Sequence, residues 1–386
     1  MQRHSSHGHL LALLLSAALA LHLCNAFLTS SHQNRHHQST TTSVAFGSAD
    51  INTTNRRRLH YNLTILIPAY NEIDRIGETL GTYINYMKHQ PVYQHSDDTI
   101  LFEQQTTITG QCSILVVDDG STDGTCQYIT EKRWLDVPND NNPNDVQQEV
   151  CTNCWKVDDH VACISLPTNQ GKGAAIARGM MELPQCCAET NEDDAFDIAR
   201  SIVLVADADG SGDISCLDDM IHSLECLLES SSSSSSSATI TDDLAIIVGK
   251  RKYPQSKKSR LRSILSWGFR TCVSTLFIGT NTNNTNNKSN RLGVTDTQCG
   301  FKLMTTPTGK LLYQNLHLKR WSHDVEVLYR ASCLLGIPVG ECSVNWVDMD
   351  GSKLVSSGKD AVVMSAVMLG EIGRMRLMYS LGRWKL

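Results

Sequence analysis

Several short apolar runs with many β-branched residues recur between residues 61 and 248. Each run is too short for a buried helix and is bounded by polar or glycine-containing segments. Each therefore predicts a buried strand of a parallel sheet. The predicted strands are residues 61–68, 112–117, 162–166, 202–205 and 245–248.

Patterns with a helical period follow several of these runs, at residues 75–87, 173–182 and 217–229. Strands that alternate with helices in this order form a doubly wound, mostly parallel sheet with helices on its faces. The predicted fold class is therefore α/β, in one catalytic domain of residues 61–355.

Polar, low-complexity segments interrupt this pattern and include a run of serines and a stretch rich in asparagine. We predict that they are disordered surface loops without chemistry, because they lack the apolar residues needed for a core. They lie near residues 89–110, 131–160, 186–199, 230–243 and 281–290.

The N-terminus carries an apolar stretch at residues 10–28, about as long as a membrane-spanning helix. A short flank of residues 1–9 precedes it and a polar tether of residues 29–60 follows it. We expect an uncleaved transmembrane anchor because the run exceeds a usual signal-peptide core; a cleaved signal peptide is the alternative. Basic residues lie mainly after the stretch, which favours a single-pass protein with its catalytic domain in the cytosol.

Two further segments, at residues 256–279 and 356–386, combine basic and apolar residues. This mixture suits a helix that lies in a membrane interface and contacts membrane lipid. We predict that residues 356–386 form an amphipathic, membrane-proximal segment. The alternative for both segments is a helix that packs on the sheet.

Composition narrows the possible partners and the redox state. The formal net charge of −6 provides no overall positive field, so we expect no nucleic-acid partner. Fourteen cysteines in a chain of this length do not form a small disulfide scaffold. Cys151 and Cys154 also lack a second pair of ligands for zinc. We therefore expect reduced thiols.

Polar residues follow the first two predicted strands, at the sheet edge where open parallel sheets bind ligands. In the segment 68–72 (PAYNE), a proline is expected to end the strand, and Tyr70 and Glu72 to face a ligand. Asp118 and Asp119 follow the second strand in an acidic loop that contains glycine. This loop is either a ligand site or a turn with a helix cap.

Asp207 and Asp209 follow the fourth predicted strand with one residue between them. Two carboxylates at one strand end suit Mg²⁺ or Mn²⁺ bridging a diphosphate, although this short motif alone is weak. Lys172 lies in a glycine-containing loop that opens a helix, a favourable place for phosphate. The alternative for Lys172 is an ordinary surface lysine near a turn.

The motifs PAYNE, VVDDGSTDGT, NQGKGAAIARG and ADADG occur in this order on these strands. Together they resemble the inverting family 2 glycosyltransferases, which have the GT-A fold, over about residues 63–350. The later segments at 248–251, 296–302 and 320–328 look most like the dolichyl-phosphate β-glucosyltransferases of that family. The resemblance implies transfer of glucose from UDP-glucose to dolichyl phosphate with inversion, for N-glycan precursor assembly at the endoplasmic reticulum membrane.

The resemblance also implies roles for the strand-end residues. Asp118 or Asp119 would contact uracil or ribose, while Asp207 and Asp209 would hold the metal and the diphosphate. Lys172 would lie near phosphate. The nucleotide pocket would be lined by Pro68, Ala69, Tyr70 and Glu72.

Asp324 stands at the late acidic position of the family, where enzymes with hydroxyl acceptors keep a general base. A lipid phosphate is already ionised near neutral pH, so orientation of the sugar or of other residues is the alternative role. The acceptor phosphate needs cationic partners, for which Arg251 is best suited by its bidentate geometry. The acceptor-phosphate candidates are Arg251, Lys302 and Gln298, with Lys250 and Arg320 as further cations.

Three other functions compete with this interpretation. A GDP-mannose-dependent polyprenyl-phosphate mannosyltransferase would share the early motifs and the metal. A catalytically inactive member would bind nucleotide-sugar as a scaffold. A secreted or Golgi-lumenal transferase would act on a hydroxyl acceptor, which the sequons and the possible cleavage site favour.

Overall fold

The computed structural model describes residues 61–88, 112–132, 161–183, 200–232, 243–252, 273, 294–347 and 358–386. The predicted anchor and tether at residues 10–60 lie outside these residues. Most residues of the predicted insertions also lie outside them. Among the helices within them, none is long and apolar enough to span a membrane.

A seven-stranded sheet forms the centre of the domain, in the order β3-β2-β1-β4-β6-β5-β7. Every neighbouring pair is parallel except the two made by β6, which runs antiparallel to both β4 and β5. The prediction of an α/β fold with a mostly parallel sheet is therefore confirmed. The strands are β1 (Tyr61–Ala69), β2 (Cys112–Asp118), β3 (Val161–Ser165), β4 (Arg200–Val205), β5 (Ile246–Lys252), β6 (Lys302–Thr305) and β7 (Val339–Asn345).

The sequence predicted the first five strands but neither β6 nor β7. β6 is only four residues long and begins with a lysine, and β7 contains a glycine and a glutamate. Neither has the continuous apolar run of a central parallel strand. The predicted end of β1 at Pro68 was also wrong, because the ladder continues through Ala69, whose carbonyl accepts the N–H of Asp119 at 2.8 Å.

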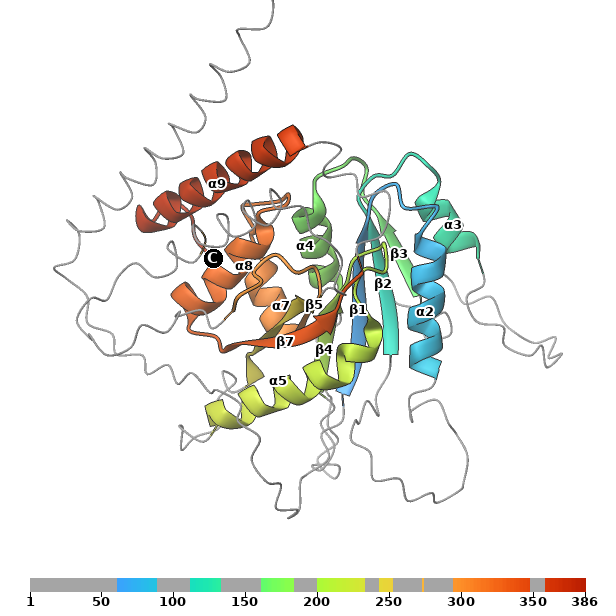
Figure 1. Ribbon diagram of the computed structural model, residues 1–386, viewed down its shortest axis with the longest axis horizontal. Coiled ribbons are helices and arrows are strands. Elements are labelled where there is room, and N and C mark those ends of the chain that lie inside the picture. The colour runs from blue at the N-terminus through green and yellow to red at the C-terminus, as the bar shows by residue number, and fades with distance from the viewer. Residues whose placement is uncertain are drawn as a thin grey trace, which may run out of the picture.

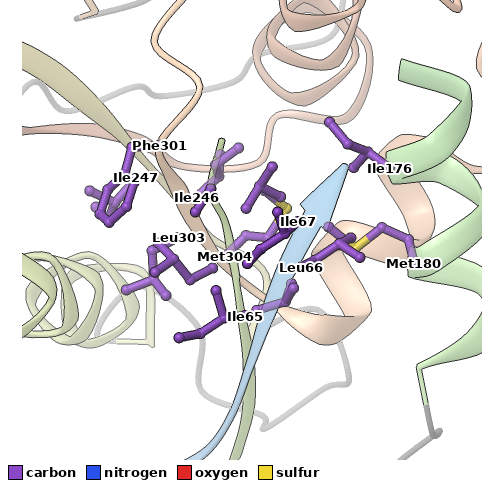
Figure 2. Close-up of a cluster of buried hydrophobic side chains, with 14 of the residues drawn as sticks. Ile65, Leu66, Ile67, Ile176, Met180, Ile246, Ile247, Phe301, Leu303 and Met304 are labelled. Carbon is purple, nitrogen blue, oxygen red and sulfur yellow. The ribbon is translucent and has the colours of Figure 1, made fainter. Parts of the chain in front are cut away.

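Helices cover both faces of the sheet (Figure 1). On one face, α4 (Lys172–Glu182) packs on β1 and β2 and on α7 (Thr306–Tyr313), as in Figure 2, where Ile176 and Met180 reach toward β1. On the other face, α5 (Leu217–Ser232) packs on β5 and β7. α2 (Ile76–Lys88) and α3 (Thr125–Glu131) complete the layers. Since α5 continues to Ser232, the first serines of the predicted 230–243 insertion are helical instead.

The C-terminal part is helical and packs on itself. α8 (His323–Tyr329) runs directly into a π-helical segment, η4 (Arg330–Leu335), and contacts α9 (Gly358–Ser380). Ile372 and Met375 of α9 are fully buried, so one face of this helix packs on the domain, against α8 and not on the sheet as the alternative had it. Its relation to a membrane stays a prediction.

A buried ion pair between α8 and η4 is linked to α9 by a tyrosine. Arg330 Nη2 lies 2.7 Å from Glu326 Oε1, and both side chains are fully inaccessible to solvent. Tyr379 of α9 donates its hydroxyl proton to Glu326 at 2.8 Å and accepts from Arg330 Nε at 2.7 Å. Burial alone would raise the pKa of Glu326, but the Arg330 guanidinium and the hydrogen bonds from Leu318, Tyr379 and His317 together lower that pKa. The charge is therefore compensated, and α9 is held at a fixed position on α8.

Candidate active site

The loops after β1 and β2 are joined by hydrogen bonds. Asn71 N donates to Ser121 Oγ at 2.8 Å, and Thr122 N donates to Asn71 Oδ1 at the same distance. Asn71 takes a positive φ of 53°, a conformation in which asparagine is well tolerated. Tyr70, next to Asn71, is 38% exposed. Tyr70 is thus exposed to solvent and its contact with a ligand stays a prediction, whereas Ala69 is buried in the strand.

Asp118 and Asp119 are only 1% and 3% exposed. Asp118 accepts the hydroxyl of Ser165 at 3.0 Å. Asp119 accepts the backbone N–H groups of Gln170 and Gly171 at 2.7 and 2.8 Å, and burial raises its pKa. Asp119 therefore fixes the loop before α4, whereas Asp118 holds the end of β3 and accepts the N–H of Ser121 at 3.3 Å in its own turn. The turn alternative thus fits Asp118, and neither carboxylate caps the helix that follows its own loop. A contact with uracil or ribose stays a prediction.

Asp207 and Asp209 lie just after β4, with side chains 23% and 25% exposed. Asp209 Oδ1 accepts the hydroxyl of Ser211 at 2.6 Å, which leaves Oδ2 directed toward Arg75 Nη1 at 3.9 Å. Lys172 forms an ion pair with Asp207 Oδ1. The predicted carboxylate pair and Lys172 are therefore brought together.

This carboxylate pair fits a divalent cation. Carboxylate oxygens are the hard ligands that Mg²⁺ and Mn²⁺ prefer, and Mg²⁺ commonly binds one or two carboxylates together with substrate phosphate and water. Within the described ranges, no group of three or more His, Cys, Asp and Glu side chains could hold a metal by itself. The remaining ligands would then come from the nucleotide diphosphate. The ammonium of Lys172 beside Asp207 shows that this point favours positive charge.

Glycines allow three segments to meet at Asp207 and Lys172. A Cβ on Gly300 would lie 2.6 Å from Asp207 Oδ1 and nearer still to Oδ2, so only glycine fits beneath this carboxylate. A Cβ on Gly173 would lie 2.6 Å from His323 Cβ. Burial acts to lower the pKa of Lys172, but the charges of Asp207 and Asp324 outweigh it and raise that pKa. Lys172 is therefore a permanent cation of the site.

Asp324 is buried at the start of α8, next to Lys302 and His323. Its Oδ1 lies 2.6 Å from Lys302 Nζ and 3.1 Å from His323 Nε2. The Nδ1–H of His323 donates to the carbonyl of Arg320 at 2.7 Å, so Nε2 is the nitrogen turned to the carboxylate. Burial alone would raise the pKa of Asp324, but His323 and Lys302 outweigh it and hold that pKa well below its usual range.

The predicted acceptor-phosphate residues have different environments. Lys302 has a side chain only 1% exposed and is engaged by Asp324, so the prediction of a phosphate contact is wrong for the structure as it stands. Arg251 donates from Nε and Nη2 to Asp296 at 2.7 and 2.8 Å and lies over the ring of Trp346. Its side chain is still 26% exposed.

The other polar candidates lie nearer the surface. Gln298 is half-buried, with Nε2 3.9 Å from the sulfur of Met368 in α9. Lys250 Nζ lies 3.4 Å from Glu341. Arg320 is exposed, and its backbone and Cγ lie against Gly171 at the start of α4. Arg320 is therefore exposed, whereas the Arg251 guanidinium is held by Asp296 and only partly exposed.

Sequence reasoning missed three residues of this site. Arg75 bridges Glu72, with Nε 2.8 Å from Oε2, to Asp209. His323 and Gly300 are the other two. A histidine next to the late aspartate was a visible signal, because adjacent titratable groups perturb one another. For Gly300 no local signal existed, since its neighbour Asp207 lies far away in the sequence.

The α/β sheet brings paired carboxylates and cations together at the end of β4, an arrangement typical of enzymes that act on phosphate-bearing substrates. No protein-family model matches the chain. The chain is 30% identical to a dolichyl-phosphate beta-glucosyltransferase of Dictyostelium discoideum over 332 residues, which cover 84% of this chain and 76% of that protein. Enzymes of the same name from Mus musculus and Homo sapiens are 28% and 27% identical, each covering 84% of this chain and 78% of the relative. The chain belongs to the dolichyl-phosphate β-glucosyltransferase family.

Solved structures with a slight likeness also exist. Mannosyl-3-phosphoglycerate synthase from Rubrobacter xylanophilus has a TM-score of 0.43 at 12% identity, covering 84% of this chain and 76% of that one. Glucosyl-3-phosphoglycerate synthase from Mycobacterium tuberculosis, crystallised with Mn²⁺ and UDP-glucose, has a TM-score of 0.39 at 12% identity, covering 80% of each chain. Scores this low do not bear on the function of the chain.

Proposed function

We propose that the chain transfers glucose from UDP-glucose to dolichyl phosphate with inversion at the sugar. Its family supports the glucosyl transfer and the lipid phosphate acceptor. The observation that carries the donor assignment is the cluster of Asp207, Asp209 and Lys172 at the end of β4. Such a cluster suits the diphosphate of a nucleotide-sugar better than any neutral ligand.

In this proposal the donor lies across the ends of β1 and β4. Tyr70 and Glu72 line the nucleotide side together with the backbone at Pro68, and Asp207 and Asp209 hold Mg²⁺ or Mn²⁺ with the diphosphate. When bound, the cation offsets the negative charge on the departing diphosphate. Lys172 contributes a second, permanent positive charge at the same end of the donor.

The transfer itself requires no protein base. An oxygen of the acceptor phosphate forms a bond to the anomeric carbon while the bond from that carbon to UDP breaks, and UDP leaves with the electron pair. Asp324 suits orientation and not proton transfer, because its pKa lies far below neutral pH whereas an effective base titrates near the working pH. Arg320 and Arg251 are the proposed contacts of the acceptor phosphate.

The proposed setting is the endoplasmic reticulum membrane, with residues 10–28 as a single-pass anchor and the catalytic domain in the cytosol. The state of the cysteines supports a reducing compartment: every cysteine in the described ranges is a free thiol. The product would then serve N-glycan precursor assembly.

The test is transfer of radiolabelled glucose from UDP-glucose to dolichyl phosphate by the detergent-solubilised full chain. We expect a glucolipid that disappears with a chelator, returns with Mg²⁺ or Mn²⁺, and is lost in Asp209→Asn. GDP-mannose in parallel separates the mannosyltransferase alternative. Binding of UDP-glucose without any lipid product, from protein that unfolds cooperatively, would leave the inactive scaffold as the better description.

A further inference from the structure

One side of α9 is apolar and faces outward. Counting from Val363, the exposed positions follow at intervals of three and four residues, so they form one stripe along the helix. Val363, Val367 and Leu377 are 45%, 42% and 41% exposed, and Leu381 just after the helix is 56% exposed. A helix packed on one side normally carries polar residues on the other. The exposed side of α9 instead carries mainly apolar large side chains.

The charges beside the stripe are positive. Arg374 is exposed on the stripe itself, and Arg383 and Lys385 are exposed beyond the end of the helix. Glu371, the acidic residue of α9 after Val363, is half-buried and accepts the hydroxyl of Ser322 at 2.6 Å. The outward surface therefore combines apolar side chains with cations, which complements an anionic lipid surface.

Residues on the flank and inner side of α9 contact segments next to the candidate active site. Glu371 contacts Ser322, two residues before Asp324, and Met368 contacts Gln298 in the loop beside Asp207. Figure 1 shows α9 lying along the end of the molecule where the loops after β1 and β2 also lie. A membrane on the outer stripe would thus lie beside the site where a lipid phosphate must arrive.

We propose that the outer stripe of α9, with Arg374, Arg383 and Lys385, lies on an anionic membrane surface and presents the site to its lipid acceptor. α9 lies in the interface and does not cross the bilayer, in agreement with its limited apolar length. This inference rests on the lipid phosphate acceptor of the proposed function. It adds the surface by which that acceptor is reached.

The direct test places a photo-crosslinking amino acid at Val367 or Leu377 of the full chain, reconstituted in phosphatidylcholine vesicles with radiolabelled phosphatidylinositol. The matched control position is Met181, which is 44% exposed at the far end of α4. We expect lipid label on the α9 positions about ten-fold above the control, as for apolar side chains that enter an interface. Labelling no higher than at Met181, or crosslinks to a second copy or another segment of the chain, would overturn the proposal.

The kinetic test uses Val367→Glu with Leu377→Glu and, as control, Met181→Glu. We expect the double variant to raise the KM for dolichyl phosphate in vesicles about ten-fold. Its kcat/KM for a short, water-soluble polyprenyl phosphate should stay unchanged. Equal loss with both acceptors, or an equal effect of the control, would contradict a membrane role. Absence of transfer by the unaltered chain with either acceptor would instead contradict the proposed function, while the crosslinking would still report on the surface.

Discussion

The ammonium of Lys302 lies 2.6 Å from Oδ1 of Asp324, and both groups are buried between β6 and α8. Removing one partner of such a pair leaves a buried charge without compensation. We expect Lys302→Met to lower the free energy of unfolding by about 3–5 kcal/mol, measured by urea denaturation.

The matching double variant tests whether this loss arises from the pair. Lys302→Met combined with Asp324→Asn removes both charges, so it should be more stable than Lys302→Met alone. A double variant that loses the sum of the two single effects would show that the two groups act independently. Glucosyl transfer should be low in Lys302→Met, in Asp324→Asn and in the double variant, because Asp324 is either absent or no longer held in place by Lys302.

Asp324 should also give the stability of the protein a pH dependence. Its folded pKa lies well below the unfolded value of about 3.9, so its contribution is fully present above that value. The contribution is lost as the pH falls toward the folded pKa. Between about pH 5 and pH 2, the unfolding free energy of the unaltered protein should fall more steeply than that of Asp324→Asn. Parallel curves would show that Asp324 is not held ionised in the fold.

Gly300 should be required for the position of Asp207. A methyl group at residue 300 would lie 2.6 Å or less from the carboxylate oxygens of Asp207 and push them aside. We expect Gly300→Ala to lower kcat/KM about 100-fold, since misplacement by about 1 Å can cost that much. Gly81→Ala is the control, because nothing lies within 4 Å of the added carbon there. A fully active Gly300→Ala would mean that Asp207 need not occupy this position.

Arg330 should be required to hold α9. Its guanidinium donates to the carbonyls of Leu312, Gln314 and Asn315 as well as to Glu326 and Tyr379. We expect Arg330→Met to lower the free energy of unfolding by about 3–5 kcal/mol. Hydrogen exchange should show the loss concentrated in α8 and α9. Uniform exchange across the sheet would instead indicate a general loss of stability.

Much of the fold was predictable from local patterns. β1, β2 and β4 carry continuous apolar runs because parallel strands are covered on both faces. β6 is four residues long and starts with Lys302, so its pairing depends on strands that are distant in sequence. The packing of α9 was also not predictable. Its buried and exposed sides are both largely apolar, so its sequence alone did not show which side packs.

The α/β order and the acidic strand ends, including Asp207 and Asp209, were predictable without the fold. This was possible because the ends of parallel strands meet at one edge whatever loops connect them. The burial of Lys302 against Asp324, the place of Gly300 beneath Asp207 and the packing of α9 on α8 followed from the folded structure alone. These contacts join segments far apart in the chain, and burial and pKa depend on what surrounds a group in space.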